Sequence, residues 1–402
     1  MNRTYTHAIA AALLAATALA TPARAAETGT ALDRNAIRTA IATQLKAGGT
    51  LTVWADDSRF KTFFAEVVAP RFAKSRGIKV EFAVKPAATI TTEIAAAKEA
   101  GRPSPADLVL MSDARARGFV EAGLASGRVL DLLPHSKDID PAIANVADAA
   151  YMAGSTVPFD IRQQVVAFDQ SKVAASAVET TEGLAAFAGS HPKRVGFVPG
   201  FGKQYGATFL ETLLISLPVN GCRGFIYDAK LGERGADVWA HGECALHTVN
   251  YLRLLKPNAE TRRTPAELML ALAKGRVDVA ILDETDVAEA ASRGALPATV
   301  RTTMLKTGQA REVTQIIVPM TAVHQLASYA LADDLLSEAV QKAKLDRLGS
   351  RSPRASVMTA AVAPWYVPAA RFAAATRAKP VGVLTEAVAP RVALEAFDLA
   401  QK

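Results

Sequence analysis

The pattern of apolar and polar positions between residues 50 and 111 changes repeatedly from strand spacing to helix spacing. Apolar or alternating segments, which predict strands, cover residues 51–54, 78–84 and 108–111. Helical spacing covers residues 60–76 and 90–100. We expect Ser58 to cap the first helix, Pro70 to bend or restart it and Gly77 to end it. This order of elements predicts a parallel sheet with helices on both faces.

A similar pattern restarts after residue 160 and predicts a second α/β lobe. Strands are expected at 165–168, 194–198 and 277–282, and helices at 183–188, 207–216, 236–255 and 264–275. Thr264, Pro265 and Glu267 have the spacing of a capping box with proline at the first helical position. From about residue 314 the chain adds one more strand and several alanine-rich helices. Because there is no internal repeat or low-complexity linker, we expect crossing strands to join the two lobes.

Candidate binding residues follow the predicted strands. Ligands of open α/β sheets bind outside the carboxyl ends of the strands. The alternative for any single acid or serine at these positions is that it only caps the next helix. Taken together the loops favour a cleft, and its candidate ligand-binding residues are Trp54, Asp56, Asp57, Ser112, Asp113, Asp160, Lys203, Tyr205, Asp283 and Glu284.

The glycine-containing loop at 199–206 lies between a predicted strand and a predicted helix and carries Lys203. Backbone N–H groups at such a helix start can hold an anion. The loop is no Walker loop, because no Gly-Lys-Ser or Gly-Lys-Thr closes it. The alternative is that its glycines only make a tight turn.

The N-terminus has the pattern of a secretory signal peptide. Arg3 precedes an apolar run at 8–20, and Ala23-Arg24-Ala25 is a small-x-small cleavage site. The run is shorter than the about 20 residues that a membrane anchor needs, and no nearby cysteine could carry a lipid. We therefore expect cleavage after Ala25 and a periplasmic protein that is not lipid-anchored.

Composition then limits the partners. The chain has 402 residues, half of them hydrophobic, which allows roughly two domains with a large core. The formal charge of +7 becomes +5 when Arg3 and Arg24 leave with the signal peptide, and there is no run of basic residues. A spread excess of this kind is typical of a solvated surface, so we expect no nucleic-acid partner.

The two cysteines, Cys222 and Cys244, are expected to form a disulfide because the compartment is oxidising. The alternative is a zinc site, since His241, Cys244 and His247 have three-residue spacing. A chain of this length does not need a metal to be stable, which favours the disulfide.

A secreted hydrolase or transferase of the penicillin-binding type is the alternative function. Ser190 and Lys193 have Ser-x-x-Lys spacing, and Lys306-Thr307-Gly308 follows. However, Pro192 interrupts the first motif, and no Ser-x-Asn lies between the two. No Gly-x-Ser-x-Gly, His-Glu-x-x-His or paired metal motif is present. We expect no enzyme activity, no catalytic residue, no cofactor and no metal site.

Several segments resemble the extracellular solute-binding protein family of ABC importers, in its larger two-lobed class. They are Leu51–Trp54, Ala106–Met111, Val157–Asp160 running into Val165–Phe168, Gly275–Ile281 and Leu331–Gln341. The resemblance implies an α/β fold of two lobes, each a mostly parallel sheet flanked by helices. It implies hinge crossings at Val157–Asp160 and near Ile316–Met320.

The same resemblance implies how the lobes are divided and what they do. Lobe 1 would contain residues 26–157 and about 315–345, and lobe 2 residues 158–314 and about 346–402. The lobes would close around a small-molecule ligand and dock on an ABC permease in the inner membrane, with the binding protein itself a monomer.

The class of ligand stays open at this stage. The carboxylates, with the aromatic faces of Trp54, Tyr205 and Tyr366, would suit a cationic amine. Four basic residues would instead suit phosphate or carboxylate: Arg59, Arg115, Arg162 and Lys203. A molecule with both charges would use both sets. Because no histidine or tyrosine cluster appears, we expect a small charged organic solute rather than a bare metal ion.

Overall fold

Three parallel strands form the sheet of the first lobe. The computed structural model describes residues 35–39, 41, 49–140, 143, 154–199, 209–217, 243–359, 363–372, 397–398 and 400. Strand β1 (Thr50–Ala55) lies between β2 (Lys79–Val84) and β3 (Leu108–Ser112) and pairs with both in parallel. Helix α4 (Ala87–Glu99) connects β2 to β3, and α5 (Asp113–Glu121) follows β3. The predicted order of elements is confirmed here.

The connection between β1 and β2 is a continuous helical segment with a π-helical turn. It consists of α2 (Phe60–Phe63), the π-helical turn η1 (Phe64–Val68) and α3 (Ala69–Arg76). Pro70 is the second residue of α3 and has no N–H to donate, so the expected bend takes the form of the π-helical turn just before α3. Gly77 ends the helix with a φ of 72°, as predicted.

The predicted side-chain cap at Ser58 is wrong. Arg59 occupies the position before the helix, and no side chain caps it. The carboxylate of Asp57 accepts the Arg59 N–H at 2.8 Å, so a turn centred on the aspartate precedes the helix. This turn fixes the direction in which the Arg59 side chain leaves the loop.

A second set of parallel strands forms the sheet of the second lobe. Strand β5 (Val195–Phe197) pairs in parallel with β6 (Ala259–Thr261) and β7 (Val279–Asp283). The helices of this lobe are α9 (Thr181–Ser190), α10 (Phe209–Ser216), α13 (Glu243–Leu255), α14 (Pro265–Ala273) and α15 (Glu284–Ser292). The predicted cap is confirmed, because Thr264 Oγ1 accepts the Glu267 N–H at 3.2 Å. Strand β6, with only three residues, has no recognisable period in the sequence.

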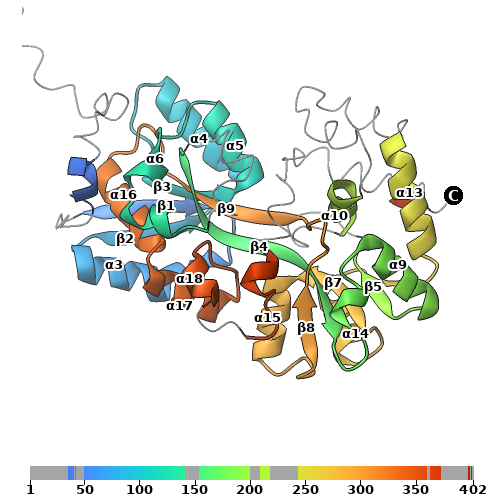
Figure 1. The fold of residues 1–402 in the computed structure, drawn as a ribbon. Coiled ribbons are helices and arrows are strands. Elements are labelled where there is room, and N and C mark those ends of the chain that lie inside the picture. Colours follow the sequence, from blue (N-terminus) through green and yellow to red (C-terminus); the bar gives the residue numbers. More distant parts are fainter. Residues whose placement is uncertain are drawn as a thin grey trace, which may run out of the picture.

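Antiparallel strands join the two parallel sets. Strand β4 (Thr156–Asp169) pairs with β9 (Arg311–Ile317) through its first half and with β7 and β8 (Val300–Thr303) through its second. The described strands therefore form one sheet in the order β2-β1-β3-β9-β4-β7-β5-β6, with β8 also on β4. In Figure 1, β4 and β9 run from one lobe to the other. The expected α/β fold of two lobes with crossing strands is confirmed.

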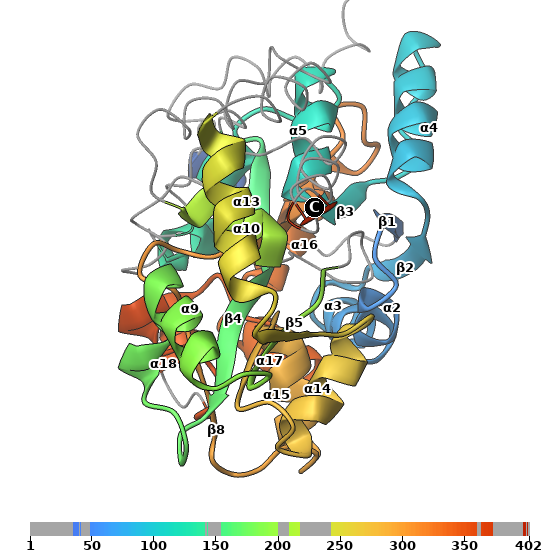
Figure 2. The same cartoon turned by 90° about the vertical axis from the view of Figure 1, so that its right-hand side faces the viewer.

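Helices cover both faces of each lobe (Figures 1 and 2). In the first lobe, α4 and α5 pack on one face in a cluster that contains Trp54 and Phe119. The other face carries α2, α3, α16 (Gln325–Leu335) and α17 (Glu338–Leu348). In the second lobe, α9, α10 and α13 cover one face and α14 and α15 the other.

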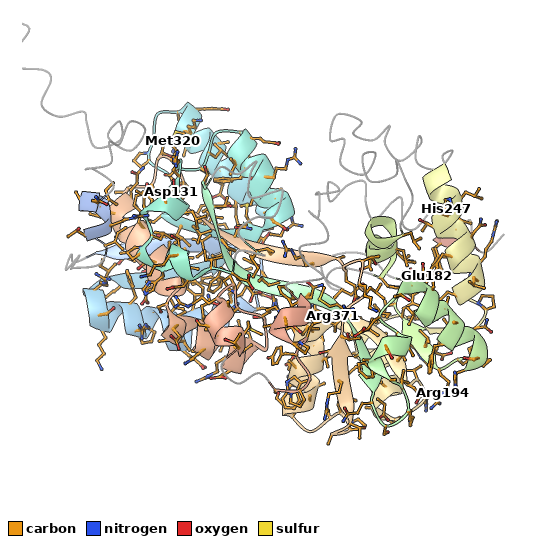
Figure 3. All side chains as sticks on the ribbon, in the orientation of Figure 1. Asp131, Glu182, Arg194, His247, Met320 and Arg371 are labelled. Atoms are coloured by element: carbon orange, nitrogen blue, oxygen red, sulfur yellow. The ribbon has the colours of Figure 1, made fainter. Side chains whose placement is uncertain are left out.

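Short helices and the C-terminal segment complete the fold. The short helices are α6 (Val129–Leu132), η2 (Pro134–Asp138), η3 (Ala175–Ala177) and α18 (Ala355–Thr359). The segment 363–372 lies against the second lobe, where Thr302 Oγ1 donates to the Trp365 carbonyl at 2.9 Å. Arg371, labelled in Figure 3, donates to the Met304 carbonyl at 2.6 Å.

Candidate ligand-binding site

The carboxyl ends of strands from both lobes meet at the middle of the crossing strands. Ser112, the last residue of β3, pairs with Thr314 of β9. Asp283, the last residue of β7, pairs with Gln164 of β4. Because Thr314 also pairs with Asp160 of β4, the two strand ends lie only a few residues apart along the crossing. This is where the fold class places ligands.

The loop after β1 brings two ion pairs to this place. Arg115 of α5 donates to Asp56 at 2.9 Å, and Arg59 donates to Asp57 at 2.7 Å. Arg59 also donates to Asp160 at 3.2 Å, which joins the loop to the crossing strand β4. Burial lowers the pKa of Arg59, but Asp160 and Asp57 outweigh burial and raise the pKa above its usual value.

Asp160 is fully buried and has a second cationic partner. Lys344 of α17, also 0 % exposed, donates to it at 2.6 Å and to the Phe159 carbonyl at 3.0 Å. Burial alone would raise the pKa of Asp160, but Lys344 and Arg59 outweigh it and hold the pKa at about 2. Asp160 is therefore ionised although it is buried inside the fold.

Arg162 of β4 forms ion pairs with acidic side chains of the second lobe. Its guanidinium donates to Asp283 at 2.9 Å and lies 3.6 Å from Asp286 in the first turn of α15. Asp283 in turn accepts the Thr285 N–H at 2.9 Å and so caps α15. Asp283 raises the pKa of Arg162 and outweighs burial, which lowers it. Hence Arg162 stays charged between the lobes.

Two acids at the crossing have raised pKa values. Glu312 of β9 lies directly opposite Arg162 in the β4–β9 ladder. Burial raises the pKa of Glu312 to about 7, with smaller contributions from Asp56 and Asp57, against the attraction of Arg162 and Arg59. Burial, followed by Asp283, raises the pKa of Asp286 to about 6. Both carboxyl groups therefore change charge near neutral pH.

Trp54 and Glu284, both predicted as ligand contacts, are engaged in packing and ion pairing. Trp54 is 6 % exposed, belongs to the α4–α5 core and has the Lys85 ammonium 3.5 Å from its ring centroid. Glu284 is 1 % exposed and accepts two hydrogen bonds of 2.8 Å from Arg351. It also accepts the Val367 N–H at 2.7 Å.

Of the other residues predicted as ligand contacts, some lie near the crossing strands and some lie outside the described part of the chain. Asp56, Asp57, Asp160 and Asp283 are brought together at the crossing, with Ser112 and Asp113 at the start of α5. Lys203, Tyr205 and Cys222 lie outside the described residues, and Cys244 contributes its backbone to α13. The disulfide and its zinc alternative thus stay predictions.

Asp286 and Glu312 are not among the binding residues predicted from the sequence. Asp286 lies three residues after the end of β7, one helical turn inside α15, and this position after a strand is a usable signal. Glu312 lies inside a strand, opposite a residue 150 positions away. Only the pairing of β4 with β9 reveals its place.

The residues of the alternative enzyme motif have other partners. Ser190 ends α9, and its hydroxyl donates to the Ala186 and Phe187 carbonyls at 3.0 and 3.2 Å. The Lys193 ammonium donates to the Ala259 carbonyl of β6 at 2.9 Å.

Within the described part of the chain, no group of three or more histidine, cysteine or acidic side chains is arranged to hold a metal ion. In that same part, no helix is long and apolar enough to span a membrane.

Comparison with known proteins identifies relatives at the level of family and fold. A family model for bacterial extracellular solute-binding proteins matches residues 68–373. No curated protein sequence matches the chain.

Solved structures similar to this fold include three substrate- or iron-binding proteins. PotD, the substrate-binding protein of a spermidine/putrescine ABC transporter from Streptococcus pneumoniae, is 14 % identical with a TM-score of 0.56, over 77 % of this chain and 85 % of that one. Iron-bound HitA from Pseudomonas aeruginosa is 19 % identical with a TM-score of 0.53, over 88 % and 98 %. An iron- and citrate-bound protein from Trichodesmium is 14 % identical with a TM-score of 0.54, over 86 % and 98 %. At these identities the likeness shows the fold alone.

Proposed function

The chain belongs to the bacterial extracellular solute-binding protein family, and on this premise we propose that it is the periplasmic substrate-binding component of an ABC importer. It captures a small charged organic solute between its lobes and delivers it to an inner-membrane permease. The observation that carries the proposal is the meeting of charged side chains from both lobes at the crossing strands. Arg59 comes from the first lobe, Asp283 and Asp286 from the second, and Arg162 from the strand that joins them.

Closure of the lobes follows from the same arrangement. The proposed division puts residues 26–157 and about 315–345 in lobe 1, and residues 158–314 and about 346–402 in lobe 2. The hinge is then the start of β4, at Val157–Asp160, and the C-terminal end of β9, near Ile316–Met320. Because the charged side chains lie beside these strands, a solute bound to both sets would hold the lobes together. Lys203 and Tyr205, which lie outside the described residues, are proposed to complete the site.

Export is the second part of the proposal. The apolar run at 8–20 and the Ala23-Arg24-Ala25 site support cleavage after Ala25 and release into the periplasm. Mass spectrometry of protein purified from the native cell would then give a mature N-terminus at Ala26. A full-length product would contradict a periplasmic role.

Ligand-dependent compaction tests the proposed function. A thermal-shift screen of charged organic solutes finds a ligand, because binding to the folded state alone raises its melting temperature. Small-angle scattering with and without that ligand should show a smaller radius of gyration when it is bound. Mass spectrometry should recover the ligand unchanged. Turnover of the ligand, or binding without compaction, would count against a substrate-binding component of an importer.

A further inference from the structure

The charges at the crossing strands do not balance. The carboxylates there are those of Asp56, Asp57, Asp283, Asp286 and Glu312, and the guanidinium groups are those of Arg59, Arg115 and Arg162. Asp160 is left out of this comparison because Lys344 neutralises it. Among these described side chains, acidic groups therefore outnumber basic ones by five to three. A positively charged group would reduce the mutual repulsion of the carboxylates.

Among these acids, Glu312 is the one whose carboxylate most needs a positively charged partner. The guanidinium groups that face it are committed elsewhere: Arg162 pairs with Asp283 and Asp286, and Arg59 with Asp57 and Asp160. Arg311, the next residue on β9, points to the opposite face of the strand. The Glu312 side chain is partly exposed. A partly buried carboxylate without an ion-pair partner among the described residues is costly when it ionises.

Arg59 supplies an independent observation at the same place. Its Nη1 is buried and has no acceptor among the described residues, although Nε and Nη2 donate to carboxylates. Buried N–H groups are normally paired, and an unpaired one is costly. An oxygen acceptor on a bound solute would satisfy it.

We propose that Glu312 and Asp286 receive an ammonium group of the solute, that Arg59 Nη1 donates to an oxygen of the same solute, and that binding releases a proton. This inference rests on the proposed function and adds the class of ligand to it. The solute is thus an organic amine with a nearby carboxylate or hydroxyl oxygen. Arg162 stays paired with Asp283.

Proton release follows from the raised pKa values of the two acids. With pKa values of about 7 for Glu312 and about 6 for Asp286, both are largely protonated at pH 5.5 and ionised at pH 8. The charged groups that set these values are Arg162 on β4, Arg59, Asp56 and Asp57 after β1, and Asp283 at the end of β7. Arg115 of α5 is held by Asp56, and Glu284 of α15 by Arg351. A bound ammonium group stabilises the ionised forms, so affinity rises with pH.

Three matched probes test the ligand class in thermal-shift assays of the mature protein at pH 8. L-Ornithine carries ammonium and carboxylate groups, 1,4-diaminobutane lacks the carboxylate, and pentanoate lacks the amines. We expect the largest shift with L-ornithine, a smaller one with 1,4-diaminobutane and none with pentanoate. Binding of 1,4-diaminobutane without L-ornithine would remove the role of Arg59. A shift with pentanoate alone, or with none of the three, would overturn the proposed class.

The proton-linked part is tested by calorimetric titration of L-ornithine at pH 5.5 and pH 8. Affinity should be at least about tenfold lower at pH 5.5, since the acid that must ionise has a pKa more than one unit higher. At pH 7, titrations in two buffers of different ionisation enthalpy should differ in apparent enthalpy by the heat of a released proton. An affinity that does not change with pH would overturn proton release.

Glu312→Gln and a matched control separate the site from general charge effects. Glu312→Gln should weaken L-ornithine binding about tenfold at pH 8 and remove most of its pH dependence. Glu81→Gln, an exposed position on β2, should change neither. Far-UV circular dichroism checks that both variants fold. Compaction with an anionic ligand instead would leave the proposed function intact and refute only this inference.

Discussion

Two sets of ion pairs beside the crossing strands consist of the same residue types but differ in burial and in charge balance. The fastening pairs, Lys344–Asp160 and Arg351–Glu284, are at most 2 % exposed, and each buried carboxylate has a buried cation beside it. The crossing cluster, which includes Arg162, Asp286 and Glu312, is partly exposed and has excess acid. Buried charges are tolerated in proteins only when fully paired. The balance between acidic and basic groups therefore distinguishes the ion pairs that stabilise the fold from the charged side chains that are available to a solute.

The fastening pairs also explain how the chain after β9 returns to the crossing strand β4. Arg351 shares backbone hydrogen bonds with Ile161 in both directions, and its side chain joins Glu284 of α15 to the Val367 carbonyl. Lys344 donates to the Arg351 carbonyl at 2.9 Å. Through these contacts α17, β4, α15 and the segment 363–372 are held together beside the crossing strands.

The largest effect is expected from breaking a fastening pair. Arg351→Ala leaves the buried carboxylate of Glu284 without its cation, which typically costs about 3–5 kcal/mol in unfolding free energy. Urea unfolding at pH 7 measures it. Arg293→Ala is the matched control, because Arg293 pairs with Glu289 at the exposed surface of the same helix and should cost less than about 1 kcal/mol. Equal losses in the two variants would remove the distinction between buried and exposed pairs.

A smaller effect is expected from acid at the other fastening pair. The pKa of Asp160 is lowered in the folded protein, so its ion pairs stabilise the fold above the unfolded value near 4 and this contribution is lost as the pH falls through about 2. The shift corresponds to about 2 kcal/mol. Urea unfolding of the wild type and Asp160→Asn between pH 4 and pH 2 measures it. The two proteins should converge as the pH falls, and a constant difference would refute this account.

The smallest effect, of opposite sign, is expected in the crossing cluster. The pKa of Glu312 is raised, so the folded state binds a proton more tightly than the unfolded state and loses stability as the pH rises from about 5 to 8. Glu312→Gln removes this loss and should raise the unfolding free energy at pH 8 by about 1 kcal/mol, allowing for partial exposure. Unfolding curves at pH 5 and pH 8 test it. A variant that is less stable than the wild type at pH 8 would place Glu312 among the structural pairs.

Local pattern was sufficient for most of the secondary structure. The alternation at 78–84 gave β2, and Thr264 with Glu267 gave the start of α14, because each depends on neighbours in the chain. Ser58 was predicted wrongly because the turn at Asp57 competes for the same place before the helix. Strand β8 was missed because its four residues gain their partner, β4, only in the folded sheet.

The sequence by itself determined the order of elements, the two-lobed α/β class and the acids that follow β1 and β7. Those features follow from the period of apolar residues and from the place of polar residues after strands. The tertiary structure alone decided which acids are buried in ion pairs and which face the crossing. Glu284 and Asp286 lie two residues apart on α15, yet one is enclosed by Arg351 and the other faces Arg162 at 34 % exposure. The reason is that the pKa and partners of a carboxyl group depend on charges distant in sequence, and the fold brings these together only when β4 pairs with β9 and α17 packs beside them.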